Sequence, residues 1–150
     1  MESTIITTKN AKETQKAGQV LAKGILKEED RQYATVVALQ GELGGGKTTF
    51  VQGMVEGLRI KEQITSPTFV ILKRYDIDNK DYNYFYHIDC YRLNSEQDIL
   101  DLDFKNIVSN SKNIIAIEWA EKVKSILPDN TIWINFKYID KNKREIVVGK

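Results

Sequence analysis

Residues 41–48 decide the fold, and they read Gly41-Glu42-Leu43-Gly44-Gly45-Gly46-Lys47-Thr48. The stretch matches G-x-x-x-x-G-K-[ST], the pattern of a loop whose backbone N–H groups wrap around a phosphate. Before it, residues 33–40 are β-branched and apolar nearly throughout, as in a strand that is buried on both faces. After it, apolar residues recur on one helical face of residues 47–56. A strand, a glycine-rich turn and a helix in this order predict a phosphate-binding loop.

Each residue type in this loop has a chemical reason. Glycines permit a positive φ angle, and the first turn of the following helix directs its free N–H groups at the same anion. Lys47 supplies a positive charge to the β- and γ-phosphates, and the hydroxyl of Thr48 is a ligand for Mg²⁺. We therefore predict that ATP and Mg²⁺ bind here, with contacts from Gly41, Glu42, Leu43, Gly44, Gly45, Gly46, Lys47, Thr48 and Thr49.

The choice of ATP over GTP depends on residues 79–82, which read Asn-Lys-Asp-Tyr. A GTPase usually reads guanine with Asn-Lys-x-Asp, and Tyr82 stands where the aspartate is needed. The near match also falls in a polar turn between two strand candidates, which is the wrong place for base recognition. Adenine is therefore the expected base.

Composition limits the other functions. The chain has 150 residues, which we interpret as a single domain spanning residues 1–150. Lys plus Arg is 22 and Asp plus Glu is 21, so a direct electrostatic grip on nucleic acid is not expected. Cys90 is the only cysteine, which excludes an internal disulfide and a multi-cysteine metal site. Neither a signal peptide nor an apolar run of membrane-spanning length is found, so we expect a cytoplasmic protein without membrane contact.

The hydrophobic pattern predicts an α/β fold: a P-loop NTPase-like mixed β-sheet flanked by helices. Asn10 with Glu13 resembles a capping box at the start of a helix, and Gly57 is a candidate C-cap for the helix that follows the loop. We expect helices at residues 11–27 and 47–56, a short helix from Ser95, and strands at residues 4–8, 33–40, 68–75, 83–90, 113–117, 131–138 and 144–148.

Two carboxylates are placed for phosphoryl chemistry, because each ends a strand near the expected loop. Asp89 ends the strand of residues 84–88 and Glu118 ends that of residues 114–117, so either is a candidate for the Walker-B-type carboxylate. Strand alternation puts His87 on the same face as Asp89. We expect His87 to be a packed histidine that hydrogen-bonds Asp89 rather than a catalytic group. Trp119 is a candidate either for the core or for the site.

Residues 65–69, Thr-Ser-Pro-Thr-Phe, follow the loop helix where GTPases place their first switch. Two hydroxyls beside a rigid proline suit a contact with magnesium or water, and the alternative is an ordinary turn into a strand. Arg74, Arg92 and Arg144 are candidates for stabilising charge during phosphoryl transfer, although arginines mostly lie on surfaces.

Taken together, these motifs resemble the TsaE (YjeE) family of small bacterial ATPases. The resemblance extends from about Glu13 to Val148 and rests on residues 41–50, on Ser66, Pro67, Thr68 and Phe69, on His87-Ile88-Asp89-Cys90-Tyr91-Arg92-Leu93, and on Ile117-Glu118-Trp119. Gly45 and Cys90 depart from the residues usual in the family, and neither change removes a functional group.

The resemblance implies roles for individual residues. Thr48 and Glu118 would ligate Mg²⁺, Asp89 would support hydrolysis together with Lys47 and Glu118, and residues 66–69 would form a switch. Thr14 and Arg144 would contact the nucleotide.

The resemblance also implies a task in the threonylcarbamoyladenosine modification of tRNA. ATP binding and hydrolysis would reset a complex of TsaD-like and TsaB-like partners, and tRNA would be met only indirectly. The expected docking surface is the switch together with Tyr91, Arg92 and Leu93. Two alternatives remain: a small-molecule kinase, for which residues 96–119 lack an arginine-rich lid, and a nucleotide-gated binding module whose hydrolysis is only a timer.

Overall fold

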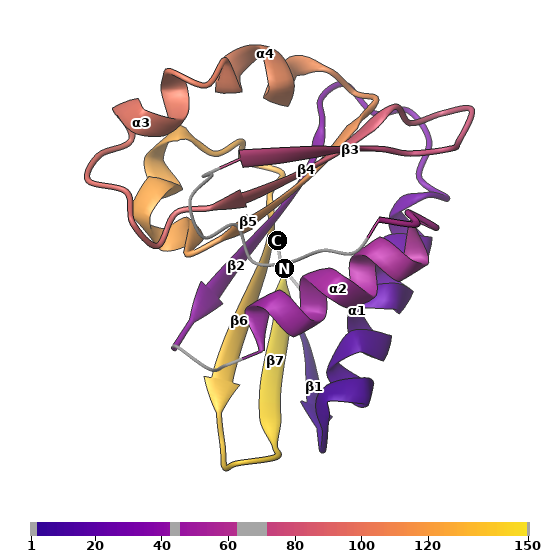
Figure 1. Cartoon of the computed structure of the whole chain (residues 1–150), viewed down its shortest axis with the longest axis vertical. Helices are drawn as coiled ribbons and strands as arrows, with labels where there is room; N and C mark the ends of the chain where they lie inside the picture. Colours follow the sequence, from indigo (N-terminus) through magenta and orange to yellow (C-terminus); the bar gives the residue numbers. More distant parts are fainter. Residues whose placement is uncertain (1–2, 43–45, 63–71, 150) are drawn as a thin grey trace.

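The chain folds around one seven-stranded mixed sheet, with strand order β1-β7-β6-β2-β5-β4-β3 (Figure 1). The computed structural model describes residues 3–42, 46–62 and 72–149. Its elements in chain order are β1 (Thr4–Thr8), α1 (Ala11–Ile25), β2 (Thr35–Gly41), α2 (Lys47–Gly57), β3 (Leu72–Asp76), β4 (Tyr84–Asp89), α3 (Gln97–Leu100), α4 (Phe104–Ser109), β5 (Asn113–Glu118), the 3-10 helix η1 (Ala120–Ile126), β6 (Ile132–Tyr138) and β7 (Arg144–Gly149).

The centre of the sheet is parallel, which places its chemistry at one edge. Strand β2 pairs in parallel with β5 and with β6, and β5 pairs in parallel with β4. The outer strands are antiparallel: β3 on β4, β7 on β6, and β1 on β7. The carboxyl ends of four neighbouring strands therefore meet at a single edge, the usual location of ligand sites in α/β sheets.

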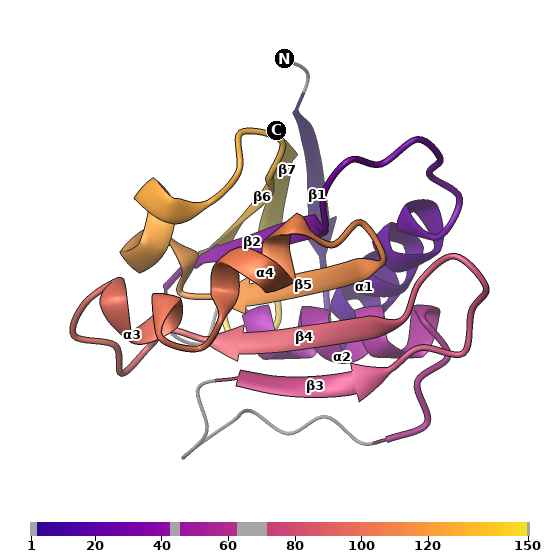
Figure 2. The same ribbon diagram turned by 90° about the horizontal axis from the view of Figure 1, so that it is seen from above.

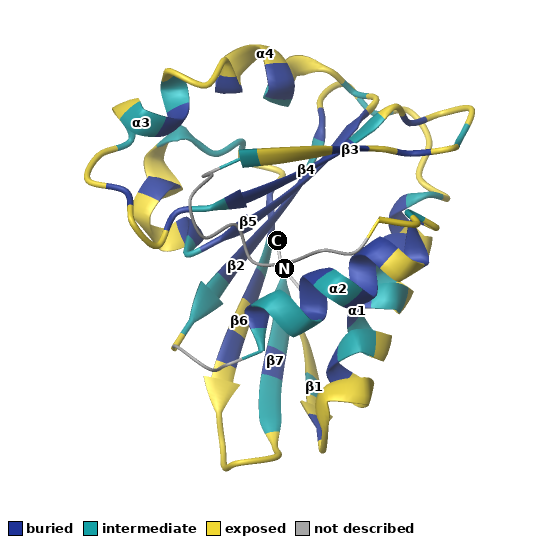
Figure 3. Cartoon of the chain, viewed as in Figure 1, coloured by how far each residue is buried: buried dark blue, intermediate teal, exposed yellow. Residues whose placement is uncertain are grey.

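Helices cover both faces of the sheet, as the two perpendicular views show (Figures 1 and 2). Helices α1 and α2 pack on one face against Val37 and Leu39 of β2. Helices α3, α4 and η1 pack on the other against Val36 and Ala38 of the same strand. All six residues of β5 are buried, so the middle of the sheet is covered from both sides (Figure 3). The near-continuous apolar runs of β2 and β5 follow from this double coverage.

Helices α1 and α2 lie unusually close because glycines line their contact. A Cβ atom added at Gly53 would lie 1.9 Å from the carbonyl oxygen of Gln15, and one added at Gly18 would lie 2.1 Å from that of Phe50. Only residues without a side chain permit this approach. The contact fixes α2, whose first turn follows the phosphate loop.

The predicted fold class is confirmed, and the differences concern local detail. Helix α1 ends at Ile25, two residues early, and strand β2 extends one residue further to Gly41. The expectation for Gly57 is wrong, because it is the last residue of α2 and Leu58 caps the helix in a right-handed conformation. Helices α4 and η1 were not anticipated. Residues 68–71 of the expected third strand lie outside the described residues.

Within the described ranges, no helix is both long enough and apolar enough to cross a membrane.

Candidate functional site

Two glycines of the phosphate-loop motif lie at the end of β2 and at the start of α2. Gly41 has a φ angle of +138°, and a Cβ atom there would lie 2.2 Å from the carbonyl oxygen of Phe136. Gly46 caps α2 with a φ angle of +101°, and its carbonyl accepts the first helical hydrogen bond, from Phe50 N at 2.9 Å. Both positions therefore require glycine, for steric and conformational reasons. Leu43, Gly44 and Gly45 lie outside the described residues.

Lys47 is held at the mouth of the loop by three contacts. Its Nζ donates hydrogen bonds to the carbonyl oxygens of Gly41 and Glu42, both at 2.9 Å, and it lies 4.2 Å from the centre of the Trp119 ring. Only 5% of the residue is exposed. Desolvation by burial lowers the pKa of Lys47, and the neighbouring carboxylates, Glu118 first among them, partly oppose this shift. A desolvated cation in this position is prepared for an anionic ligand.

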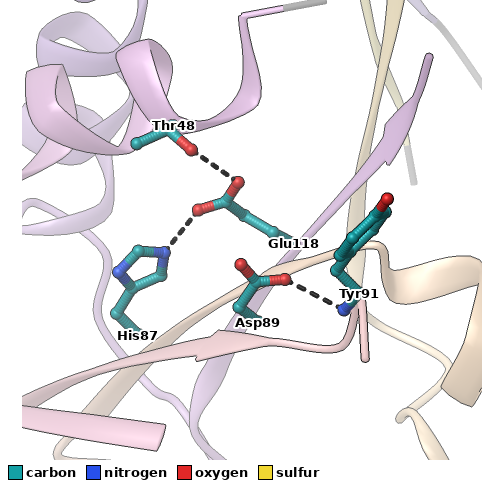
Figure 4. Close-up of polar contacts among 5 residues, drawn as sticks. All are labelled: Thr48, His87, Asp89, Tyr91 and Glu118. Atoms are coloured by element: carbon teal, nitrogen blue, oxygen red, sulfur yellow. Dashed lines mark hydrogen bonds and ion pairs between the residues drawn. The ribbon is translucent and has the colours of Figure 1, made fainter. Parts of the chain in front are cut away.

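Thr48 and Glu118 meet at the first turn of α2 (Figure 4). Glu118 ends β5, and its two register partners are Leu39 of β2 and Asp89 of β4. The hydroxyl of Thr48, in the first turn of α2, donates to Glu118 Oε1 at 2.8 Å. The structure thus brings together the two residues that the resemblance proposes as magnesium ligands.

His87 has a different partner from the one expected from the sequence. Its Nε2 lies 2.6 Å from Oε2 of Glu118, and not in the predicted hydrogen bond with Asp89 (Figure 4). The reason is the register, because β4 lies directly beside β5 and His87 is opposite Ala116. The small alanine leaves room for the imidazole to lean along the neighbouring strand toward Glu118.

Asp89 lies opposite Glu118 at the end of β4 and shapes the turn that follows. Its Oδ1 accepts a hydrogen bond from the backbone N–H of Tyr91 at 3.0 Å. The Tyr91 ring packs on Trp119 with ring centres 5.1 Å apart, and Lys122 Nζ donates to the Tyr91 carbonyl at 2.5 Å. Trp119 is therefore partly buried against the core and also forms a wall of the site between Tyr91 and Lys47.

These residues surround a cavity of about 490 Å³ at the carboxyl edge of the sheet. This volume lies in the range of small-molecule sites. The predicted residues that line the cavity are Thr14, Gly46, Lys47, Thr48, Thr49, Asp89, Tyr91, Glu118, Trp119 and Arg144. His87 and Arg92 are not in its wall, because His87 lies beneath Glu118 and Arg92 is exposed on the turn after β4.

Thr14 and Arg144 reach the cavity from α1 and from the start of β7. Thr14 is 3% exposed and exchanges a hydrogen bond with the hydroxyl of Thr8 at 2.8 Å. Arg144 begins β7, and its Nη1 donates to the carbonyl oxygens of Asp140 and Lys143 at 2.8 and 3.0 Å. Its guanidinium carbon lies 4.7 Å from the centre of the Tyr138 ring. Among the described residues that line the cavity, it is the only arginine.

Sequence reasoning missed four residues of the wall, namely Asn10, Ala11, Lys141 and Asn142. Asn10 was interpreted only as a helix cap, a role that it has, since its Oδ1 accepts from Glu13 N at 2.9 Å. Lys141 and Asn142 lie in the turn between β6 and β7. Because β6 runs parallel to β2, that turn emerges at the same edge as the phosphate loop. The sequence shows that this turn is polar, but its place beside the cavity follows only from the strand order.

The side-chain oxygens at this site fit Mg²⁺, an ion that needs only a few ligands from the protein. They do not fit a metal that is held by protein side chains alone. No group of three or more His, Cys, Asp or Glu that could hold an ion occurs in the described part of the chain. Mg²⁺ is usually bound by one or two protein oxygens together with substrate phosphates and water. Thr48 Oγ1 and Glu118 Oε1, 2.8 Å apart beside the phosphate loop, fit that arrangement.

Two further groups of candidates are not among the described residues of the cavity wall. Ser66, Pro67, Thr68 and Phe69, the predicted switch, fall outside the described residues. Arg74 is on β3, with its guanidinium carbon 4.3 Å from the centre of the Tyr84 ring. Tyr82, which stands where a guanine-reading motif needs an aspartate, is fully buried and donates to the carbonyl of Ile25 at 2.8 Å, so its role is in packing.

Comparisons with known proteins identify the family. A sequence profile described as "Threonylcarbamoyl adenosine biosynthesis protein TsaE" matches residues 8–146. A Treponema pallidum (strain Nichols) protein, named tRNA threonylcarbamoyladenosine biosynthesis protein TsaE, is 40% identical over 142 residues, which cover 95% of this chain and 97% of that protein. A Rickettsia typhi protein of the same name is 37% identical over 145 residues, covering 96% and 93% of the two chains. A crystal structure of Bacillus subtilis YdiB matches with a TM-score of 0.73 and 28% identity, covering 98% of this chain and 84% of that one. Over nearly its whole length, then, the chain belongs to the TsaE family.

Proposed function

We propose that this protein binds ATP with Mg²⁺ in the cavity beside α2 and hydrolyses it to ADP and phosphate. The observation that carries the proposal is the convergence of Lys47, Thr48, Asp89 and Glu118 around one cavity at the end of the phosphate-loop strand. These side chains supply a cation, a hydroxyl and two carboxylates. Phosphoryl transfer depends mainly on positioning and charge neutralisation, which such a set provides.

Each residue has a defined task in this proposal. The Gly41 and Glu42 carbonyls hold the Nζ of Lys47 in place by hydrogen bonds. In the complex with ATP, this ammonium group contacts the β- and γ-phosphates. Thr48 and Glu118 hold Mg²⁺, which neutralises the phosphate charge when bound. Asp89 orients the water that attacks the γ-phosphorus, or accepts its proton, as the bond to the ADP oxygen breaks. Thr14 and Arg144 hold the nucleotide from the other wall of the cavity.

The biological setting follows from the family. The relatives carry names that place them in tRNA threonylcarbamoyladenosine biosynthesis, and we propose the same pathway for this chain. ATP binding and hydrolysis would drive the cycle of a TsaD-like and TsaB-like complex that performs the transfer. The nearly balanced charge, 22 basic against 21 acidic residues, favours contact with tRNA through those partners rather than directly.

The binding site is tested with Lys47→Ala. We expect this variant to lose ATP affinity and hydrolysis while keeping its fold, because it removes the cation and leaves the helix intact. The measurements are isothermal titration with ATP and Mg²⁺ and steady-state phosphate release. Lys105→Ala, which removes an exposed lysine on α4, is the matched control. Unchanged affinity and turnover in Lys47→Ala would refute the proposed site.

The pathway is tested in cells by deleting the gene and analysing tRNA nucleosides by mass spectrometry. We expect threonylcarbamoyladenosine to disappear and to return when the wild-type gene, but not Lys47→Ala, is restored. A small-molecule kinase would leave the nucleoside unchanged. Intact modification in the deletion strain would therefore reject the pathway while leaving the ATP site to be judged by its own titration.

A further inference from the structure

The Glu118 carboxylate is buried and is held from two sides. Only 3% of the residue is exposed, and its two oxygens have different partners. Oε1 accepts from Thr48 on α2 at 2.8 Å, and Oε2 faces His87 Nε2 on β4 at 2.6 Å. The carboxylate thus bridges the helix that follows the phosphate loop and the strand that ends in Asp89.

Among the described residues, the His87 side chain has no polar contact other than Glu118 that explains why an imidazole is present. The side chain is fully buried, and its Nδ1 has no hydrogen-bond partner within the part of the chain that the structure describes. Burying an unpaired polar atom is unfavourable. An apolar side chain of similar size would fill the space without that penalty. The contact with Glu118 is therefore the feature that requires histidine.

The chemistry of the pair fixes its direction. A carboxylate can only accept hydrogen bonds, so Nε2 carries the hydrogen and donates it to Oε2. With Oε2 engaged in this way, rotation of the carboxylate is restricted and Oε1 stays directed at Thr48. His87 itself does not line the nucleotide cavity, so it acts on the site only through Glu118.

We propose that His87 is a positioning residue that holds Glu118 in the orientation in which Oε1 and Thr48 together receive Mg²⁺. The inference rests on the proposed function, because the metal enters with the nucleotide. Hydrogen-bond partners behind metal-binding side chains commonly alter metal affinity by about 10–100-fold when they are removed. His87 occupies that place for Glu118.

The test compares three variants that differ in whether a donor reaches Glu118. His87→Leu removes the donor, His87→Gln places an amide N–H at about the position of Nε2, and His87→Asn carries the same amide one methylene short. For each protein, binding of a non-hydrolysable ATP analogue is titrated calorimetrically in EDTA and at a series of Mg²⁺ concentrations. Melting curves in EDTA report the fold separately.

We expect His87→Leu to weaken the apparent Mg²⁺ affinity in the presence of the analogue by about 10–100-fold. Its analogue affinity in EDTA should equal that of the wild type. His87→Gln should restore most of the Mg²⁺ response, and His87→Asn should not. If His87→Leu does not fold, the comparison of Gln with Asn carries the test alone.

Three results would overturn the inference. The first is an unchanged Mg²⁺ response in His87→Leu, the second is equal loss of analogue affinity with and without Mg²⁺, and the third is identical behaviour of the Gln and Asn variants. A wild-type protein whose nucleotide affinity does not respond to Mg²⁺ would instead reject the proposed magnesium site, and this inference with it. The wild-type titration therefore distinguishes the two failures.

Discussion

The buried charge of Lys47, which the proposed function needs, lowers the stability of the fold. The side chain is 5% exposed, and its burial lowers its pKa from the ordinary value of 10.5 even though Glu118, Glu121, Asp89 and Glu42 oppose the shift. A lowered lysine pKa means that the folded chain holds the proton less tightly than the unfolded chain does. Until an anion binds, the charge at position 47 therefore destabilises the fold, as is common for ligand-binding residues.

This argument predicts a pH dependence for Lys47→Met in the absence of nucleotide. Between the lowered folded-state pKa and 10.5 the unfolded wild type binds more protons than the folded wild type, so wild-type stability gains with rising pH. The methionine variant lacks this gain. Relative to wild type, it should therefore be most stable below the folded-state pKa and lose that advantage as the pH approaches 10.5. Melting temperatures across pH 7–10.5 provide the measurement, with Lys105→Met as the control. A constant difference between variant and wild type across this range would contradict the prediction.

Asp89 allows charge to be separated from shape. Asn at this position keeps the size of the side chain and retains an oxygen that can accept from the N–H of Tyr91, so the turn after β4 should persist. The negative charge is lost. We expect Asp89→Asn to bind ATP within a few-fold of wild type and to lose turnover by about 10²–10⁴-fold, the usual contribution of a general base. Single-turnover phosphate release measures the effect, and the exposed Asp129→Asn is the control. Full activity in Asp89→Asn would clear this residue of a chemical role.

At the scale of elements, the contact between α1 and α2 fixes where the loop helix begins. Gly18 and Gly53 let the two backbones approach more closely than a Cβ atom would permit. Because α1 also carries Thr14 to the cavity wall, the same contact sets the distance between Thr14 and the start of α2.

Gly53→Ala should therefore destabilise the protein. The added methyl group would lie 1.9 Å from the carbonyl oxygen of Gln15, a rigid backbone atom, so the helices must separate. Overpacking of this kind typically costs about 1–3 kcal/mol. Gly24→Ala in α1 is the matched control, because nothing lies within 4 Å of its Cβ position. In the control, alanine should stabilise the helix by up to about 1 kcal/mol. Denaturant unfolding of the two variants measures both effects, and changes of the same sign would contradict the packing argument.

An element could be predicted when its own residues carry a clear hydrophobic pattern, turn or cap. The unit of β2, loop and α2 was clear, because a doubly buried strand, a glycine-rich turn and an apolar helical face occur in direct succession. Helix α4 was missed because it has six residues, of which only Phe104 and Ile107 are buried, and no side-chain cap. Residue Asp103 before it has a φ angle of +65°, which no sequence pattern announced.

The composition of the site was partly predictable and its pairing was not. Glu118 and Asp89 could be singled out as strand-end carboxylates from the sequence. The contact of His87 with Glu118 depends on β4 lying beside β5, which is a property of the sheet order. The same is true of Lys141 and Asn142, which reach the cavity because β6 lies beside β2. Contacts between segments that are distant in the sequence depend on the strand order. A hydrophobic pattern specifies that order only loosely.

For the molecule as a whole, the cavity has a rim that is partly exposed. Tyr91 is 50% exposed, although its ring packs on Trp119 in the cavity wall. The neighbouring Arg92 is exposed and outside that wall. The rim therefore joins the proposed nucleotide site directly to surface that a protein partner can cover. Such cover would exclude water from the proposed ATP site, which strengthens the electrostatic interactions inside it.

We predict that ATP hydrolysis by this protein depends on its partner proteins. The isolated protein should hydrolyse ATP slowly, and TsaD-like and TsaB-like proteins from the same organism should stimulate it strongly, because they enclose the site and can supply stabilising charge. An arginine contributed by a partner raises turnover by roughly 10³–10⁵-fold in known NTPases.

Arg92→Ala should weaken the complex more than it weakens ATP binding, since Arg92 is exposed beside the cavity but does not line it. Steady-state ATPase rates with and without the partners, and sedimentation of the mixture with ATP analogue or ADP, measure the two effects. Lys105→Ala on α4, which packs on the opposite face of the sheet from α2, is the control for loss of a surface cation. Equal turnover with and without partners, together with no nucleotide-dependent association, would leave the cavity as a site that works alone. In that case the exposed rim formed by Tyr91 and Arg92 would need another explanation.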